Sequence, residues 1–450
     1  MTIGIRISLF ALLFLISSIT PRVCCQEVAR DNSIMELSLK DAVRIAYLNN
    51  NQIQIQEEEV EIAKANILAA QGNFMPIVNV GAGYTYNDSV LYSGKIREGN
   101  KDTRIFTGYK SDNVLNITVN ESIFNGGANI ANLAQAKLGL KVQQETLRAR
   151  KLDVEFETKR LYYGVLLAYE AERIANDLVN RAKVHYDDVK NRFDQGAVSK
   201  FELLQSSVQV SKLIPDLVKA RNDVELITAE LKKLLSVDLD IPIRLRGKLY
   251  YSSVEIKEKE FLSEAYKNKP EMILKMLGIN ISKWAIEYAK AGYYPQVNAM
   301  GNYSYRSNDV ANMVNPRHDN WNIGATVTFM LFDGFSTTAK IKEAKAKYAE
   351  SYLQKEDTVQ QTAVDIKQAC LDMAKSESII KSQKDSVVEA KEALYISEIG
   401  YDNGVTTNLD VLTSQVSLGQ VETYLAQGTY DYIMAKAQLY RTMGRESLEE

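Results

Sequence analysis

The sequence predicts a mainly α-helical protein with some β-structure, in which long antiparallel coiled-coil helices are combined with four amphipathic strands by internal duplication. Three observations lead to this fold class. A proline-free stretch runs from Asn125 to Phe193. Short turn motifs recur at a constant spacing of 208 residues (334 − 126). Four segments alternate apolar with small polar residues, which is the pattern of strands with one apolar and one polar face.

Length and charge set the first limits. The chain has 450 residues, of which 25 % are charged, and a formal net charge of −3. This length is enough for two or three domains. The near-balanced charge and the lack of a basic block argue against nucleic-acid binding. After the N-terminal region, the sequence contains no apolar run that is long enough to predict a further membrane-spanning helix.

The N-terminal residues 1–25 have the features of a secretory signal peptide. A basic residue precedes a short apolar core at Ile7–Ile16, and small residues follow. Cleavage after Cys25 would leave only Cys370, so that no intrachain disulfide could form. A retained anchor is the alternative, but the apolar core is short for a span. Lipid attachment at Cys24 or Cys25 is a further alternative, although the preceding residues do not form a typical lipoprotein cleavage site.

The chain divides into two copies of one pattern. The first repeat is expected at 35–237 and the second at 261–445, each with a helix, two strands and a long helix pair. The segment 238–260 between them is either an equatorial band outside the helices or a flexible linker. The first helices are expected at roughly 38–71 and 271–292.

The predicted strands are typical of a membrane barrel. They lie at 77–86, 115–120, 296–305 and 321–331. Strands of about ten residues fit a tilted membrane strand, and Tyr and Trp lie toward the strand ends. The charged connection between the first two, with Lys95 and Arg97, is expected to be a solvated loop. A half-buried soluble sheet is the alternative.

Four strands cannot close a barrel, because even small barrels need ~8 strands. In lipid, the backbone N–H and C=O groups at an open sheet edge would have no hydrogen-bond partners. Several copies must therefore pool their strands, and a dimer or a trimer would satisfy this requirement.

The long stretches predict helical rods. Read as one helix, the stretch from Asn125 to Phe193 would be ~100 Å long. Apolar residues repeat every seven positions in both long helices and in the helices that follow, which predicts coiled-coil packing. The seam of each rod is a column of apolar residues seven positions apart. In the first rod the column is Leu133, Leu140, Leu147, Val154, Leu161, Ala168, Ala175, Ala182 and Val189, and in the second it is Val359, Ile366, Met373, Ile380, Val387, Leu394 and Tyr401.

Tight turns end the two rods. Gly196 and Gly404 are expected to reverse the chain, because glycine accepts positive φ angles. Asp410, six residues after Gly404, and Glu202, in the same slot of the first copy, can each stabilise a helix N-terminus. In a ring of copies, Asp410 could also form a negative constriction that attracts cations. Both roles are compatible.

Nothing in the sequence indicates an enzyme. No phosphate loop, zinc spacing or Ser-His-Asp arrangement is present. His185 lies among charged residues and is expected on a solvated helix face. We therefore expect no cofactor and no metal.

With the duplication, two strands per copy and turns of the form Phe193-Asp194-Gln195-Gly196-Ala197 and Tyr401-Asp402-Asn403-Gly404-Val405, the chain resembles the TolC-like outer membrane efflux protein family. The resemblance covers roughly 35–445. It implies a homotrimer with a twelve-stranded transmembrane β-barrel, continuous with a periplasmic α-barrel, in the bacterial outer membrane. It also implies a periplasmic adaptor protein and an inner-membrane transporter as partners.

Several roles are carried over from the family position by position. The periplasmic entrance would involve Asp410, Glu202 and Tyr401, the last at the position of a tyrosine that helps lock the closed tip. Thr406 and Thr413 stand where the best-known members have an arginine and a second aspartate. The adaptor would contact the tip turns at Gly196, Ala197, Val198, Gly404 and Val405.

The leading hypothesis is an exit duct of a tripartite efflux system that passes small molecules or drugs to the exterior. Alternatives are the exit duct of a type I protein secretion system and, from a different class, a secreted structural coiled-coil protein.

Overall fold

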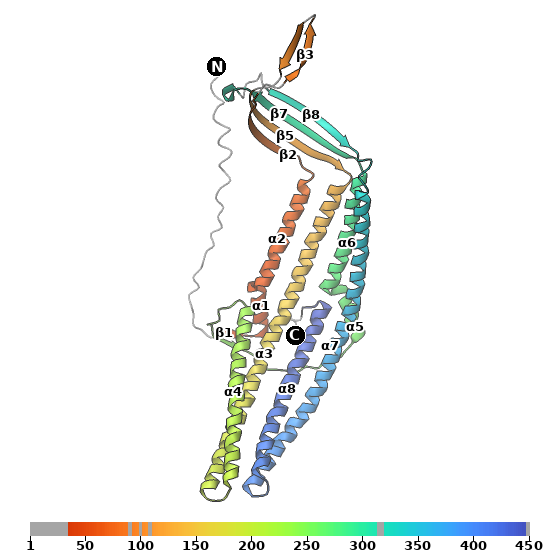
Figure 1. Cartoon of the computed structure of the whole chain (residues 1–450). Coiled ribbons are helices and arrows are strands. Elements are labelled where there is room, and N and C mark those ends of the chain that lie inside the picture. The colour runs from red at the N-terminus through yellow and green to blue at the C-terminus, as the bar shows by residue number, and fades with distance from the viewer. Residues whose placement is uncertain (1–34, 89–91, 99–100, 107–109, 313–318, 447–450) are drawn as a thin grey trace.

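The computed structural model describes residues 35–88, 92–98, 101–106, 110–312 and 319–446. The predicted signal peptide, with Cys24 and Cys25, lies outside these residues. The molecule is long and narrow, with a curved sheet at one end and two helical turns at the other (Figure 1). In the part of the chain that is described, no helix is long and apolar enough to cross a membrane.

Two helices of equal length form the rods. They are α3 (Ala128–Asp194) and α7 (Ser336–Asp402), of 67 residues each. The start of α3 lies three residues later than expected, because Gly126 and Gly127 adopt positive φ angles of 68° and 89° and end the preceding strand. The predicted seams are buried at Val154, Leu161 and Val189 in α3 and at Ile366, Met373 and Ile380 in α7. The other predicted seam positions Leu133, Leu140, Leu147 and Ala175 in α3, and Val359 and Val387 in α7, are only half-buried.

Each rod pairs with the helix that follows it. These helices are α4 (Lys200–Leu234) and α8 (Asn408–Met443), and α8 also packs on α3. The four helices form a wall one layer thick (Figure 1).

The first helix of each repeat is broken, which the sequence pattern did not predict. The expected helix 38–71 is α1 (Leu39–Asn49) followed by α2 (Asn51–Gly72), because Asn50 has extended backbone angles. In the second repeat, α5 (Glu258–Asn268) precedes α6 (Pro270–Lys290) and the short helix η1 (Ala291–Tyr293), and Lys269 has the same extended angles. The helix starts Leu39 and Glu258 are 219 residues apart (258 − 39), so α5 is the counterpart of α1 and was not predicted.

At these breaks, helices meet end to end. The Asn50 side chain donates to the Leu234 carbonyl at the end of α4, at 2.9 Å. Arg148 of α3 donates to the carbonyls of Asn268, the last residue of α5, and of Gly444, and so joins the end of α8 to the break that precedes α6. Two spatially continuous columns result, α4 with α2 and α8 with α6 (Figure 1).

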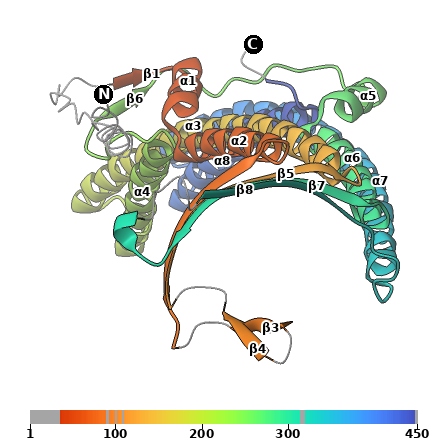
Figure 2. The ribbon, with the colours of Figure 1, turned by 90° about the horizontal axis from the view of Figure 1, so that it is seen from above.

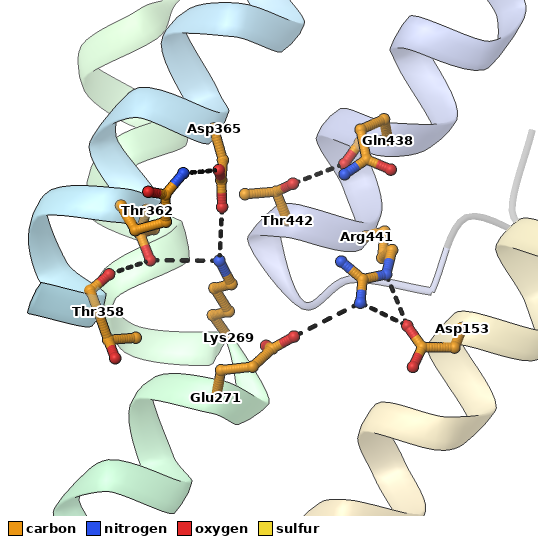
Figure 3. A network of polar contacts seen from close by, with 10 residues as sticks. Asp153, Lys269, Glu271, Thr358, Thr362, Asp365, Gln438, Arg441 and Thr442 are labelled. Carbon is orange, nitrogen blue, oxygen red and sulfur yellow. Dashed lines mark hydrogen bonds and ion pairs between the residues drawn. The ribbon is translucent and has the colours of Figure 1, made fainter. Parts of the chain in front are cut away.

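Ion pairs hold the second of these junctions, and Lys269 is the buried member among them. Lys269 Nζ lies 3.1 Å from the carboxylate of Asp365 on α7 (Figure 3). Arg441 of α8 pairs with Asp153 of α3 at 2.5 Å and with Glu271 of α6 at 3.6 Å. Four helices are thereby tied together at one level.

The main sheet has four antiparallel strands in the order β2-β5-β7-β8. The strands are β2 (Ile77–Tyr86), β5 (Ser111–Asn125), β7 (Gln296–Ser307) and β8 (Asp319–Thr328). The last ends three residues before the predicted Leu331. The connection expected to be a loop contains a hairpin instead, β3 (Tyr92–Glu98) with β4 (Lys101–Phe106), whose charged residues concealed a strand pattern.

A small parallel sheet lies on the outer side of the wall. It pairs β1 (Met35–Leu37) with β6 (Ile243–Leu245). Seen from above, these strands, α1 and α5 lie on one side of the helical layer, and the concave face of the main sheet turns to the other (Figure 2). The remaining short helix, η2 (Val310–Asn312), follows β7. The expected segment 238–260 holds β6 and the first residues of α5.

Candidate functional site

The two turns at the free end of the molecule have the same construction. Gly196 follows α3 with φ 75°, and Gly404 follows α7 with φ 74°. Each glycine N–H returns to the helix, to Phe193 O at 2.8 Å and to Tyr401 O at 3.1 Å. A Cβ added at either glycine would meet no atom within 4 Å, so the positive φ angle is what requires glycine at both positions.

Both turns lead into a capped helix. Ser199 accepts the Glu202 N–H at the start of α4. At the start of α8, Thr407 and Asp410 form a reciprocal capping box. The Thr407 N–H and hydroxyl donate to the Asp410 carboxylate at 2.8 and 2.7 Å, and these bonds lower the pKa of Asp410. The helix-capping role expected for Asp410 is confirmed, and its carboxylate is also exposed.

Tyr401 occupies a buried position between the hairpins and is 7 % exposed. Its ring packs edge-on against His185, with centroids 5.2 Å apart. Its hydroxyl lies 3.4 Å from the carboxylate of Glu202. Burial and the Glu202 carboxylate raise the pKa of Tyr401 to about 12, so the hydroxyl is a donor at neutral pH. Two predicted entrance residues are thus in contact.

Arg192 connects the end of α3 to the end of α7. Its guanidinium pairs with Asp402 at 2.5 Å and with Asp188 at 2.9 Å. The same group lies 5.0 Å from the centroid of the Tyr401 ring, a cation–π distance. This contact between the hairpins was not predicted.

A second connection centres on Asn408, the first residue of α8, which is 2 % exposed. Its side-chain oxygen lies 2.6 Å from His185 Nε2 and 3.1 Å from the Ser206 hydroxyl. Its amide nitrogen donates to Gln205 at 3.1 Å. Residues from α3, α4 and α8 are therefore joined by one amide.

The expectation of a solvated His185 was wrong, because the side chain is buried. The charged neighbours in sequence pointed to solvent. The spacing could have corrected this, because His185 follows the seam residue Ala182 by three positions, which is the other core position of a heptad.

The two threonines differ in setting. The Thr406 hydroxyl donates to the Ser397 carbonyl at 2.8 Å and packs against Gly400, where an added Cβ would lie 2.6 Å from Thr406. Thr413 is exposed and lines a groove of about 730 Å³ between α4 and α8, together with apolar residues such as Phe201.

The apolar residues of the turns are only partly accessible. Val405 is 81 % exposed, and Ala197 is exposed as well. Val198 was expected to be exposed, but it is half-buried against Val189 and Val411. The accessible tip is therefore smaller than predicted.

Among the described residues, no group of three or more His, Cys, Asp or Glu side chains could hold a metal ion. The tip is a site of hydrogen bonds, ion pairs and packing between two hairpins. Its chemistry is suited to holding a conformation rather than to transforming a substrate.

Comparison with known proteins gives a family match over most of the chain. The model of a family described as outer membrane efflux protein matches residues 42–237 and 261–445.

Individual relatives are distant. The Escherichia coli outer membrane protein TolC is 20% identical over 417 residues, with 90% of this chain and 82% of that protein covered. The Pseudomonas aeruginosa alkaline protease secretion protein AprF is 20% identical, with 90% and 83% covered. The Vibrio cholerae TolC is 24% identical over 268 residues, and the chain spans 61% of its length.

Solved structures share the fold. The Campylobacter jejuni CmeC outer membrane channel superposes with a TM-score of 0.79 at 19% identity, with 92% of this chain and 87% of that chain covered. The open state of the Neisseria gonorrhoeae MtrE outer membrane channel gives 0.74 at 17% identity, with 90% and 89% covered.

Proposed function

The chain belongs to the outer membrane efflux protein family, and we infer that three copies of it form a tripartite system's exit duct, through which small molecules or drugs leave the periplasm. Its family is one of outer membrane channel proteins rather than enzymes. The proposal goes further than the family in stating the copy number, the cargo and the residues of the entrance.

The open sheet is the observation that carries the proposal. Among the residues that the structure describes, strands β2 and β8 each have one neighbour, so neither outer edge of the sheet is paired. The sheet also exposes large apolar side chains at Val78, Val80, Trp321, Ile323 and Val327. In lipid, free edges must be paired, and pairing β2 of one copy with β8 of the next closes a ring. Three copies of four strands give twelve.

The helical edges support the same ring. On α2, the apolar residues Ile55 and Ile62 are exposed and seven positions apart. On α7, at the opposite edge of the wall (Figure 1), Val388 and Tyr395 are exposed with the same spacing. Two different edges that both carry heptad stripes favour a head-to-tail ring over a two-fold dimer.

The entrance is proposed at the tip. Three copies of Asp410, exposed at the start of α8, would form an acidic ring. Tyr401 with Glu202, and Thr406 in the second turn, would hold the hairpins of each copy in the closed arrangement. Thr413 would line the duct beside Asp410.

The tip turns would contact the adaptor, which belongs to the proposal together with the inner-membrane transporter. Gly196 and Gly404 shape the turns, and the exposed Ala197 and Val405 offer small apolar surfaces. Val198 contributes to the packing beneath them rather than to the surface.

Single-channel recording tests the entrance. We expect Asp410→Asn to weaken block by divalent cations, because it removes the ring charge while Asn can still accept the Thr407 hydrogen bonds. Glu202→Asn is the matched variant in the first repeat. Unchanged block in the Asp410 variant would remove that residue from the entrance.

Protein export remains a second candidate, favoured by one observation: two relatives are named as protease secretion proteins, AprF and PrtF. Co-purification with a drug pump or with a peptide exporter separates the two. A structural coiled-coil protein has no use for an exposed apolar sheet, and recovery from the soluble periplasm without stable oligomers would favour it.

A further inference from the structure

The junction between β8 and α7 carries an exposed apolar segment that the duct does not explain. Residues 329–332 are Phe, Met, Leu and Phe, and Leu331 is 87 % exposed. Phe335 follows, at 70 % exposed, and its ring packs edge-on against Phe332 with centroids 5.5 Å apart. The first repeat has Glu121 and Ser122 in the places of Phe329 and Met330 and keeps only Ile123 and Phe124 as apolar residues, so the apolar segment is longer in the second repeat.

Phe335 has a strained backbone, with φ 69° at the N-cap of α7. The first repeat has Gly127 at the corresponding position. The turn itself does not need the phenylalanine, because both repeats cap the helix in the same way, with Asp333 accepting the Thr337 N–H and Asn125 accepting the Asn129 N–H. Glycine would adopt this positive φ angle without strain. An exposed phenylalanine at the position therefore points to a contact of its side chain outside the protomer.

Helical periodicity places two lysines on the same face as Phe335. The positions 335, 338, 342 and 345 recur at intervals of three and four residues, so Phe335, Thr338, Lys342 and Lys345 form one stripe along α7, here called the interfacial stripe. All but Thr338 are exposed. The Tyr293 hydroxyl lies 2.9 Å from the Thr338 hydroxyl and adds an aromatic side chain at the same level.

Two further lysines mark the opposite face of the helix. Lys340 and Lys347 line a cavity of about 630 Å³ together with Asn125 and Gln296, which belong to the polar face of the sheet. The polar face turns to the interior of the proposed barrel. Lys342 and Lys345 are half a turn away, and therefore lie on the outer side.

We propose that the interfacial stripe binds the phosphate headgroups of anionic phospholipids in the periplasmic leaflet of the outer membrane, with Phe332 and Phe335 inserted at the edge of the acyl chains. The proposal rests on the duct described above.

The order of side chains fits a bilayer boundary. Aromatic residues prefer the headgroup level, and lysines extend their charge toward it from the aqueous side. Helical side chains lean toward the N-terminus, so Lys342 and Lys345 lean toward the membrane. Lys345 lies ten residues beyond Phe335, about 15 Å along the helix, and closer when its side chain is extended. The corresponding first-repeat stripe, Gly127-Ile130-Ala134-Lys137, has only one lysine.

Lipid titration of the detergent-solubilised trimer tests the headgroup site. Phosphatidylglycerol or phosphatidylcholine is added, and bound lipid is counted by native mass spectrometry. A lysine near an anionic surface contributes about fivefold, so Lys342→Gln with Lys345→Gln is expected to weaken phosphatidylglycerol binding about 30-fold per site. Phosphatidylcholine binding should not change.

The control is Lys340→Gln with Lys347→Gln, which removes the same formal charge at the same depth on the inner face and also breaks the exposed ion pair of Lys347 with Glu343. Equal losses in both double variants, or none in either, would overturn the proposal. A trimer that conducts ions but shows no phosphatidylglycerol preference leaves the duct intact and removes only the lipid site. A chain that forms neither trimers nor channels would overturn the duct itself and the lipid site with it.

Phe335→Gly tests the anchor independently. Relief of the left-handed strain should raise the melting temperature in detergent. The further rise on transfer into phosphatidylglycerol vesicles should be smaller than that of the natural chain. A lower melting temperature in detergent would contradict the strain, and an undiminished gain in vesicles would contradict the anchor.

Discussion

At the scale of single residues, Asn408 joins the two hairpins of the tip. One buried amide serves His185, Ser206 and Gln205, which come from two other helices. The equivalent position in the first repeat is Lys200 (408 − 208), which is exposed. The two duplicated turns therefore differ: the first carries an exposed lysine at this position, and the second carries a buried amide that connects α8 to α3 and α4.

Truncating this amide should loosen the tip. We expect Asn408→Ala to cost on the order of 1–3 kcal/mol of stability, because buried partners lose their hydrogen bonds. Faster amide exchange near His185 and Ser206 would report the change. Lys200→Ala should leave both regions as they are, and equal effects of the two substitutions would contradict the role of Asn408.

Asp410 gives a pH dependence whose sign is fixed by its pKa. The folded pKa lies below the ordinary value of 3.8, since Thr407 donates two hydrogen bonds to the charged form. A lowered pKa means that the cap stabilises α8 above the ordinary value and that this stabilisation is lost as the pH falls through the folded value. An NMR titration of the Asp410 carboxyl should give a midpoint below 3.8, and Thr407→Ala should move it upward.

At the scale of elements, the heptad repeat was the most reliable signal. The seam residues Val154 and Met373 are buried as predicted, because a sustained spacing of seven allows only one buried face. The breaks at Asn50 and Lys269 were missed, because a change in two backbone angles leaves the apolar pattern on both sides intact. The 219-residue offset, applied to Leu39, would have identified Glu258 as a helix start.

The tip site was predicted only in part. Glycine turns can be recognised locally, and Gly196 and Gly404 were found. The partners of Tyr401 could not be read in the same way, because Arg192 and His185 lie more than 200 residues away in the chain, and only packing determines which faces meet. Three-dimensional contacts between hairpins have no counterpart in a local pattern.

The junction of α6 with α7 contains a partly buried pair. We expect Asp365→Asn to cost about 2 kcal/mol, because the ammonium of Lys269, whose side chain is 7% exposed, would lose its carboxylate partner and keep only the Thr362 hydroxyl. A lower thermal midpoint would show the loss. Asp357→Asn, an exposed change on the same helix, is the control, and equal midpoints for both variants would contradict a structural role for the pair.

At the scale of the whole molecule, the protomer is one segment of a wall with two unlike edges. We expect Ile55→Glu with Ile62→Glu to prevent ring formation while the helical content stays unchanged, since both side chains are exposed in the protomer. Mass photometry in detergent measures the copy number. Leu239→Glu, in the outer segment and equally exposed, should leave the ring intact, and a full ring from the double variant would place the contact elsewhere.

Helices α4 and α2 meet end to end, and so do α8 and α6, although the two helices of each column are not consecutive in the chain. Each column is held across its break by side chains such as Asn50 and Arg148, and the peptide link between its halves is made elsewhere. Proteolytic nicking between Leu235 and Ile243 would therefore leave the columns standing. A circular permutant with its new termini in this segment should still form the proposed ring. The segment is therefore a suitable place for new termini or inserted domains.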